Sequence, residues 1–349
     1  MELSEGVLIG IFAGFGLIFG SFGTVVAFRV PRGESIVAGR SKCPACGHTI
    51  TAIENVPLFS YLFLRGRCRE CGMKISPRYP FIEVVTAVLF ALSAAKFDLT
   101  VEAVVYAGFF WALVVLCVID LEERKLPDAI TLPLFVVGLA GLAVAAMLDD
   151  RIGAFSLVSA VSAAGALAIT AVMFPWGRGR SAGAKRPSAE AATAKHPAAA
   201  ADEQDIDVAR PPRPRLNVVG LAVLAAWTVL LIAAFVDGEE TSFAGALIGS
   251  AVFAGFFFSI AFTYIGGMGG GDIKLALTLG AFAGYLGAPG NAAVAMFLSL
   301  LVGGVVSAVV LLRGGDRKSA LPFGPFLALG TTLAIFIGDH IQDLYGSTL

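Results

Sequence analysis

Charged side chains are scarce in this 349-residue chain. Lys, Arg, Asp and Glu together make up 15% of the residues, and the chain has only three His and five Cys. An ordinary soluble domain carries roughly a quarter charged residues, so a soluble fold would lack the polar surface to cover this much apolar sequence. Five Cys are too few for a disulfide-stapled secreted domain, and 57% apolar residues exclude intrinsic disorder. With a mean hydropathy of +0.83, the composition predicts a polytopic membrane protein.

Ten apolar runs are candidates to cross a hydrocarbon layer of about 30 Å. They lie at residues 5–28, 80–97, 101–119, 128–148, 152–175, 217–236, 242–265, 273–288, 290–312 and 321–338, and the second and eighth are short. Few strand-like alternations compete with them, so the sequence predicts an all-α protein with about ten transmembrane helices. The first run lacks a strongly basic flank and a small-residue cleavage site, which predicts a retained helix and not a signal peptide.

The distribution of Lys and Arg predicts the orientation. With the N-terminus outside, 23 of the 25 basic residues fall on the cytoplasmic side. The chain then divides into a first transmembrane helix (1–28), a cytoplasmic Cys-bearing subdomain (29–79), a set of helices (80–175), a linker rich in Ala and Pro (176–216) and a second set of helices (217–349). The linker has no apolar periodicity and is expected to be disordered.

Four of the five cysteines form two C-x2-C pairs in the cytoplasmic segment: Cys43 with Cys46, and Cys68 with Cys71. Two such pairs can supply four thiolates to one tetrahedral zinc ion. Disulfides are the alternative, but a reducing cytoplasm disfavours them. We therefore predict a structural zinc ion that stabilises a subdomain too small for a large core. The fifth cysteine, Cys117, lies within an apolar run and is expected to be a small packed residue.

Three aspartates lie at the boundaries of the predicted helices. Asp120 ends one apolar run, Asp128 begins the next, and Asp272 follows a segment with five glycines in six residues. On the predicted topology Asp120 and Asp272 lie at the same membrane face, where carboxylates usually contact a cavity, a partner or a catalytic water. Helix capping is an alternative role, and Asp128 fits it best.

Two carboxylates in one site can share a proton and act as general base and general acid on a bound water. That chemistry suits peptide hydrolysis without a covalent intermediate. From the residues alone, an ion-coupled transporter is the main alternative, although the predicted spans contain few polar residues besides Glu83. A third possibility is a membrane-anchored binding module whose basic segment contacts anionic lipid. That interpretation leaves the glycine-rich segment before Asp272 unexplained.

Several motifs occur in an order that resembles the bacterial type IV prepilin leader peptidases, which are polytopic aspartic proteases of the inner membrane. They are FGSFGTVVAFRVP, CPACGHTI, ENVPLFSYLFLRGRCRECG, ISPRYPFIEVVTAVLF, IDLEERKLPD, GMGGGDIKLA and PFGPFLALG. They cover most of the chain outside residues 150–245. A lone G-x-G-D would be weak, whereas the ordered set is specific.

The resemblance implies roles for particular residues. The catalytic pair falls on Asp120 and on Asp272, which closes the G-x-G-D motif with Gly269 and Gly271. Asp128, in the L-P-D element, and Lys274 are implied as supporting residues, and the four-Cys motif falls on the two cysteine pairs. The family removes the short basic leader of prepilins and pseudopilins after a glycine at the cytoplasmic membrane face.

Members with the cysteine subdomain commonly also methylate the new N-terminus with S-adenosylmethionine. This sequence shows no glycine-rich nucleotide-binding motif, so methyl transfer rests on the resemblance alone. Prepilins or pseudopilins and membrane lipid are the implied partners, and no nucleic acid is expected. Family members usually have eight spans, so this chain is expected to carry an inserted helix pair around the linker, which keeps Asp272 on the same side as Asp120.

Overall fold

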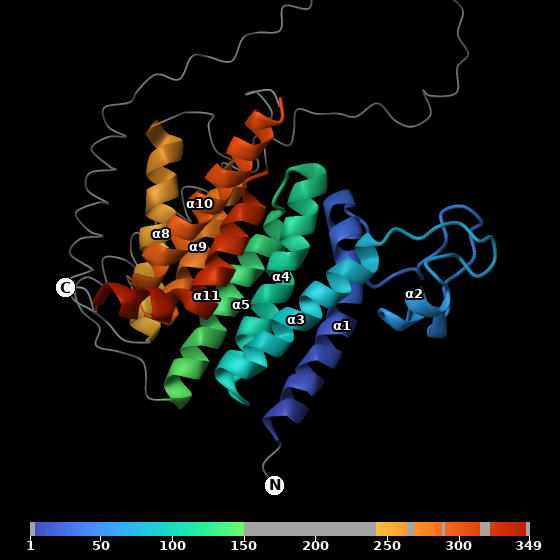
Figure 1. The fold of residues 1–349 in the computed structure, drawn as a ribbon, viewed down its shortest axis with the longest axis horizontal. Helices are drawn as coiled ribbons and strands as arrows, with labels where there is room; N and C mark the ends of the chain where they lie inside the picture. Colours follow the sequence, from blue (N-terminus) through green and yellow to red (C-terminus); the bar gives the residue numbers. More distant parts are fainter. Residues whose placement is uncertain (1–3, 150–241, 264–268, 288–289, 315–321, 347–349) are drawn as a thin grey trace, which may run out of the picture.

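The computed structural model describes residues 4–149, 242–263, 269–287, 290–314 and 322–346. The expected spans at 152–175 and 217–236 and the linker at 176–216 lie outside the described residues. Long helices dominate the rest (Figure 1): α1 (Glu5–Arg29), α3 (Arg78–Phe97), α4 (Val101–Glu123), α5 (Asp128–Leu148), α8 (Phe243–Thr263), α9 (Gly270–Tyr285), α10 (Gly290–Leu312) and α11 (Gly324–Gly346). One short helix, α2 (Phe59–Phe63), and the 3-10 turns η1 (Val30–Arg32) and η2 (Ile53–Asn55) lie between α1 and α3.

The prediction of a helical membrane protein is confirmed, while the number of ten spans is not. Seven described helices are long and apolar enough to cross a membrane: α1, α3, α4, α5, α8, α10 and α11. The run expected at 273–288 forms α9, which has only 16 residues. Among the described residues there is no strand, only two single β-bridges in the segment between α1 and α3.

Glycines allow two pairs of neighbouring helices to approach closely. On α1, a β-carbon at Gly16 or Gly20 would overlap the backbone of α3, because it would lie 2.5 Å from the Cα of Ala87 or 2.7 Å from the Cα of Glu83. On α8 and α9, Gly249 lies directly against the backbone of Gly280. Small residues at such positions favour helix association in membranes, where lipid tails compete with every other apolar contact.

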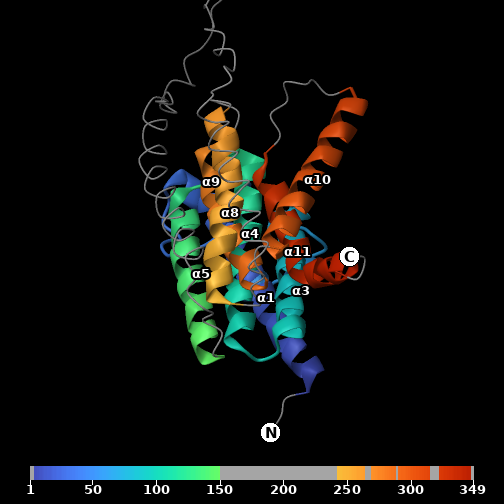
Figure 2. The ribbon, with the colours of Figure 1, turned by 90° about the vertical axis from the view of Figure 1, so that its left-hand side faces the viewer.

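The short helix α9 lies at the centre of the second half of the bundle. Every residue from Ile273 to Tyr285 is buried. Figures 1 and 2 show α9 among the long helices, with α8 along one of its sides and the α4–α5 pair close by. It packs most extensively against α8, and also against α5, α10 and α11. A helix enclosed in this way is held by contacts around its whole circumference.

Contacts between α4 and α9 show that these helices run in opposite directions. The Tyr106 hydroxyl donates to the Phe282 carbonyl at 2.7 Å, and the Tyr285 hydroxyl donates to Glu102 Oε1 at 3.1 Å. The start of α4 therefore lies beside the end of α9. The end of α4 and the start of α9 consequently lie together at the other end of the bundle.

Candidate active site and metal centre

Asp120 lies in the last turn of α4, where that helix is terminated by Arg124 in a left-handed conformation (φ 52°). The Asp120 side chain is buried, with 5% of the residue exposed. The backbone N–H of Gly324, at the start of α11, donates to Asp120 Oδ2 at 3.1 Å. A buried carboxylate is thus held by a residue 204 positions away in the chain.

Asp272 lies in the first turn of α9, directly after Gly269, Gly270 and Gly271. Gly269 is the N-cap residue and has an extended conformation, and the backbone N–H of Asp272 donates to the Gly269 carbonyl at 3.2 Å. A β-carbon at Gly269 would lie 3.2 Å from Asp272 Oδ2, so the missing side chain leaves room for the carboxylate. The idea that Asp272 is itself a helix cap is wrong, because Gly269 occupies that position.

The two aspartates lie at the same end of the bundle. Glu102 and Tyr285, which are hydrogen-bonded, mark the opposite end. At a rise of about 1.5 Å per residue, Asp120 is about 27 Å along α4 from Glu102, and Asp272 is about 20 Å along α9 from Tyr285. The structure therefore brings to one end of the bundle the two residues that the sequence singled out.

Leu126 fills the space between the segments that carry the aspartates. Its side chain would meet a β-carbon at Gly271 at 2.9 Å and one at Gly324 at 3.6 Å. Gly271 precedes Asp272, and Gly324 binds Asp120 through its backbone. The two glycines and Leu126 therefore set how closely α9, α11 and the α4–α5 loop can approach around the carboxylates.

Replacing Gly324 by alanine is expected to lower the rate of any reaction that depends on the position of the Asp120 carboxylate. The new β-carbon would lie 2.8 Å from Asp120 Oδ2, so the carboxylate or the start of α11 has to shift. Misplacement of a catalytic group by about 1 Å can cost roughly 100-fold in rate. The measurement is kcat of Gly324→Ala, with Gly304→Ala on α10 as the control, since a β-carbon at Gly304 meets nothing within 4 Å. Equal rates for both variants would contradict the role of Gly324.

Lys274 and Asp128 form an ion pair beside the aspartates. Lys274 Nζ lies 2.7 Å from Asp128 Oδ1, and the lysine side chain is 5% exposed while the aspartate side chain is 39% exposed. Asp128 is the first residue of α5 and follows the N-cap residue Pro127, so the expectation that Asp128 is the cap is wrong. Its carboxylate instead connects α5 to Lys274 in the second turn of α9.

Removing the lysine from this pair is expected to destabilise the protein. Lys274→Met leaves the Asp128 carboxylate without its partner. Because water reaches that carboxylate and partly replaces the lysine, we expect the free energy of unfolding to fall by only about 1–3 kcal/mol. Unfolding by denaturant of Lys274→Met, Asp128→Asn and the double variant measures this loss as a double-mutant cycle. Additive losses would mean that the pair contributes no coupling energy.

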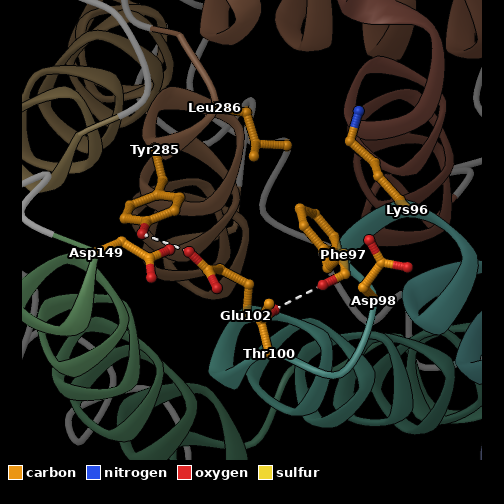
Figure 3. Close-up of a pocket in the computed structure, with 8 residues that line it drawn as sticks. All are labelled: Lys96, Phe97, Asp98, Thr100, Glu102, Asp149, Tyr285 and Leu286. Atoms are coloured by element: carbon orange, nitrogen blue, oxygen red, sulfur yellow. Dashed lines mark hydrogen bonds between the residues drawn. The ribbon is translucent and has the colours of Figure 1, made fainter. Parts of the chain in front are cut away.

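A cavity of about 230 Å³ lies at the opposite end of the bundle (Figure 3). Figure 3 shows Tyr285 and Leu286 on one side of it, with Glu102 and Thr100 below. Asp98, Asp149 and Lys96 complete its polar lining. Because this cavity lies at the end of α9 and not at its start, it is separate from the aspartate site.

The four cysteines predicted to bind zinc lie together. Their sulfur atoms are all within 4.8 Å of one another, with 3.8 Å between Cys43 and Cys71 and 4.0 Å between Cys46 and Cys68. Four thiolates at about 2.3 Å from a tetrahedral zinc ion are about 3.8 Å apart. The arrangement therefore fits a tetrahedral metal site.

The two cysteine turns have the same local structure. Cys43 N–H donates to the His48 carbonyl at 2.8 Å, and Cys68 N–H donates to the Met73 carbonyl at 2.8 Å. In each turn the glycine after the second cysteine has a positive φ, 72° at Gly47 and 69° at Gly72. A side chain would strain that conformation, so glycine is required for the turn.

The cysteine cluster favours a bound cation. The backbone N–H groups of Cys46 and Ala45 lower the pKa of Cys43 to about 6. The backbone N–H of His48 lowers the pKa of Cys46, but burial and the other three thiols outweigh this and raise it to about 12. Four thiolates in one cluster repel each other, so all four can ionise together only when a metal ion balances their charge.

Glu54 joins the two cysteine turns. Its carboxylate accepts hydrogen bonds from the Thr51 backbone N–H at 2.8 Å and the Thr51 hydroxyl at 2.9 Å, lies 3.1 Å from His48 and 3.8 Å from Arg69. The Thr51 backbone N–H, followed by His48, lowers the pKa of Glu54 to about 2. Glu54 therefore stays ionised across the pH range in which thiolates bind metal.

Three residues that shape these sites, Gly324, Leu126 and Glu54, were not predicted from the sequence. Gly324 and Leu126 lie within motifs noted in the sequence, and Glu54 lies in a third. Each acts through a contact with a residue from another segment. The sequence did carry one signal for Gly324, because it directly precedes the proline at the start of an apolar run.

Two family models match the chain. Residues 15–97 match the bacterial peptidase A24 N-terminal domain, and residues 107–183 match the type IV leader peptidase family. The first range includes all four clustered cysteines. The second includes Asp120 and Asp128 and ends before Asp272.

Relatives of the chain carry the name prepilin leader peptidase/N-methyltransferase. The protein from Aeromonas hydrophila is 30% identical over 316 residues, which cover 89% of this chain and 76% of the relative. That from Bacillus subtilis (strain 168) is 28% identical over 334 residues, 95% of each protein. That from Myxococcus xanthus (strain DK1622) is 46% identical over 125 residues, 36% of this chain and 37% of the relative.

No solved structure is significantly similar to the chain. The family can be assigned from sequence similarity. The similarity to the Aeromonas hydrophila protein extends over most of both proteins, and the two family models match consecutive parts of the chain. The chain belongs to the type IV leader peptidase family.

Proposed function

We propose that this protein is a prepilin leader peptidase and N-methyltransferase that cuts the basic leader of prepilins or pseudopilins after a glycine. The observation that carries the proposal is the presence of Asp120 and Asp272 at one end of the bundle, on helices that run in opposite directions. Relatives that bear the peptidase name along most of their length support it.

In the proposed mechanism the two carboxylates activate a water molecule. Two close carboxylates favour a state with one shared proton, because both cannot easily be ionised. The ionised carboxylate takes a proton from the water molecule while the water oxygen attacks the scissile carbonyl. The protonated carboxyl group donates its proton to the carbonyl oxygen or to the leaving amine. Gly324 holds Asp120, and the glycine turn before Asp272 lets the substrate backbone approach.

The orientation proposed for the chain follows from its basic residues. We place the N-terminus outside the inner membrane and the aspartates at the cytoplasmic face, since this puts 23 of 25 Lys and Arg inside. The cysteine subdomain and the linker at 176–216 then lie in the cytoplasm. A basic leader would meet the aspartates on the side where it is synthesised.

The cofactors are proposed from different kinds of support. Zinc suits the four cysteines, whose sulfur spacing matches a tetrahedral ion, and it would stabilise the subdomain without entering the hydrolysis. S-adenosylmethionine would supply the methyl group, and this assignment rests on the names of the relatives. The transporter alternative has no support from these relatives.

Cleavage of a purified prepilin by the full-length protein in liposomes tests the function. We expect removal of the leader after glycine, and, with S-adenosylmethionine present, a product N-terminus heavier by one methyl group. Mass spectrometry of the product distinguishes the two activities, because cleavage without added mass supports only the peptidase. An intact prepilin after incubation with the wild-type protein would contradict the proposal.

A further inference from the structure

The cysteine subdomain carries an exposed apolar helix. Of the five residues of α2, Phe59, Leu62 and Phe63 are 54%, 61% and 83% exposed. Large apolar side chains that cluster on the surface of a polar subdomain indicate a contact with another apolar phase or a partner. The three side chains of α2 therefore require an apolar environment that covers them.

A basic pocket lies directly beside this helix. It has a volume of about 410 Å³, and its lining includes Tyr61 from α2 and three cations, Arg65, Arg67 and Lys74. Within the described part of the chain, no carboxylate forms an ion pair with any of the three. The pocket therefore presents uncompensated positive charge to an anionic ligand.

The fold of the second cysteine turn holds the pocket against α2. Arg67 and Lys74 face each other across a β-bridge. The Tyr61 ring packs against Gly66, and its hydroxyl donates to the Ile75 carbonyl at 3.4 Å. The cations and the apolar face are therefore parts of one structured unit.

A buried glutamate fixes the depth of α2 relative to the membrane helices. The backbone N–H of Leu58, directly before α2, donates to Glu83 Oε2 at 2.7 Å. Glu83 is 7% exposed and packs against Gly20 of α1. It lies five residues, or about 8 Å, inside α3. Figure 1 accordingly shows α2 beside the bundle, at a level between the two ends of α1 and not beyond them.

We infer that α2 inserts into the membrane interface and that the pocket formed by Arg65, Arg67 and Lys74 binds the phosphate headgroup of an anionic phospholipid. Amphipathic helices that lie in the membrane interface bury their apolar side chains about 5–10 Å into the boundary between headgroups and acyl chains. Basic residues beside such a segment attract anionic lipid. A free phosphate could occupy the pocket but would leave the apolar face of α2 uncovered, so the two features together favour lipid.

Fluorescence quenching in nanodiscs tests the contact. The full-length protein with Phe63→Trp is placed in nanodiscs whose phosphatidylcholine has brominated acyl chains, with or without phosphatidylglycerol, and the signal of the three native tryptophans is subtracted using the wild type. Val37→Trp is the matched control, because Val37 is 91% exposed in the same subdomain but outside α2. We expect stronger quenching for Phe63→Trp than for Val37→Trp, and more quenching with phosphatidylglycerol.

Charge removal and competition separate lipid from free phosphate. Arg65→Gln and Lys74→Gln are each expected to weaken the phosphatidylglycerol effect about fivefold, while added inorganic phosphate leaves the quenching unchanged. Native mass spectrometry of the wild type from mixed nanodiscs should show retained phosphatidylglycerol, a result that needs no variant. Equal quenching at both positions, reversal by inorganic phosphate, or no preference for phosphatidylglycerol in either assay would overturn the inference.

Discussion

Asp120→Asn and Asp272→Asn are each expected to lower prepilin cleavage by roughly 10⁴-fold. The amide keeps the size and one acceptor of the side chain but can neither take nor give the proton that hydrolysis requires. Loss of either residue removes the shared-proton pair, so the double variant should be little worse than each single one. The measurement is kcat for leader removal, followed by mass spectrometry of the product.

Asp98→Asn is the matched control for these variants. Asp98 is exposed, ends α3 at the opposite end of the bundle and has a positive φ of 53°, which asparagine also tolerates. Its cleavage rate should equal that of the wild type. Because Asp120 is buried and Asp272 is partly buried, helix content and elution as a single species in detergent must be unchanged in the Asn variants. Cleavage that survives in a folded Asp120→Asn or Asp272→Asn variant would remove the two-aspartate mechanism.

Removal of zinc is expected to unfold the cysteine subdomain while the helix bundle stays folded. Structural zinc sites have apparent binding free energies of about 10–16 kcal/mol, which equals or exceeds the stability of most small domains. Chelation, or Cys68→Ser, should therefore abolish the amide protection of residues 41–76 in hydrogen-exchange measurements and leave the protection of α4 and α9 intact. Zinc loss should also rise as the pH falls, because protonated thiols do not bind the metal.

Cys117→Ser provides the comparison for that experiment. Cys117 lies within α4, outside the four-cysteine cluster, so its replacement should change neither the zinc content nor the protection of the subdomain. Metal analysis of the purified protein should give one zinc ion per chain. Unchanged protection of residues 41–76 after complete loss of zinc would show that the subdomain folds without the metal.

The sequence was informative about the positions of helices and about which end of the bundle carries the site. The apolar runs predicted the described long helices because each contains enough apolar residues to span the membrane. The C-x2-C spacing predicted the cysteine cluster, since that spacing itself determines a turn. Alternation of spans placed Asp120 and Asp272 at one face without any contact being known.

Contacts between distant segments could not be predicted. A helix that is apolar on all sides, such as α1 or α8, does not reveal which of its faces meets a neighbour. The Lys274–Asp128 pair and the bond from Gly324 to Asp120 join residues 146 and 204 positions apart. Both depend on how helices are rotated, and rotation is decided by packing in the folded protein.

The length of α9 has a consequence for the choice of substrate. Sixteen residues extend only about 24 Å, less than the roughly 30 Å of hydrocarbon. Because Tyr285 at the end of α9 is hydrogen-bonded to Glu102 at the start of α4, the shortfall lies at the Asp272 end. A peptide that reaches this carboxylate must itself enter the membrane plane, and its backbone must be unwound there because helical amides are occupied by their own hydrogen bonds. We therefore expect the depth of Asp272 to exclude the loops of soluble proteins as substrates before any side chain is recognised.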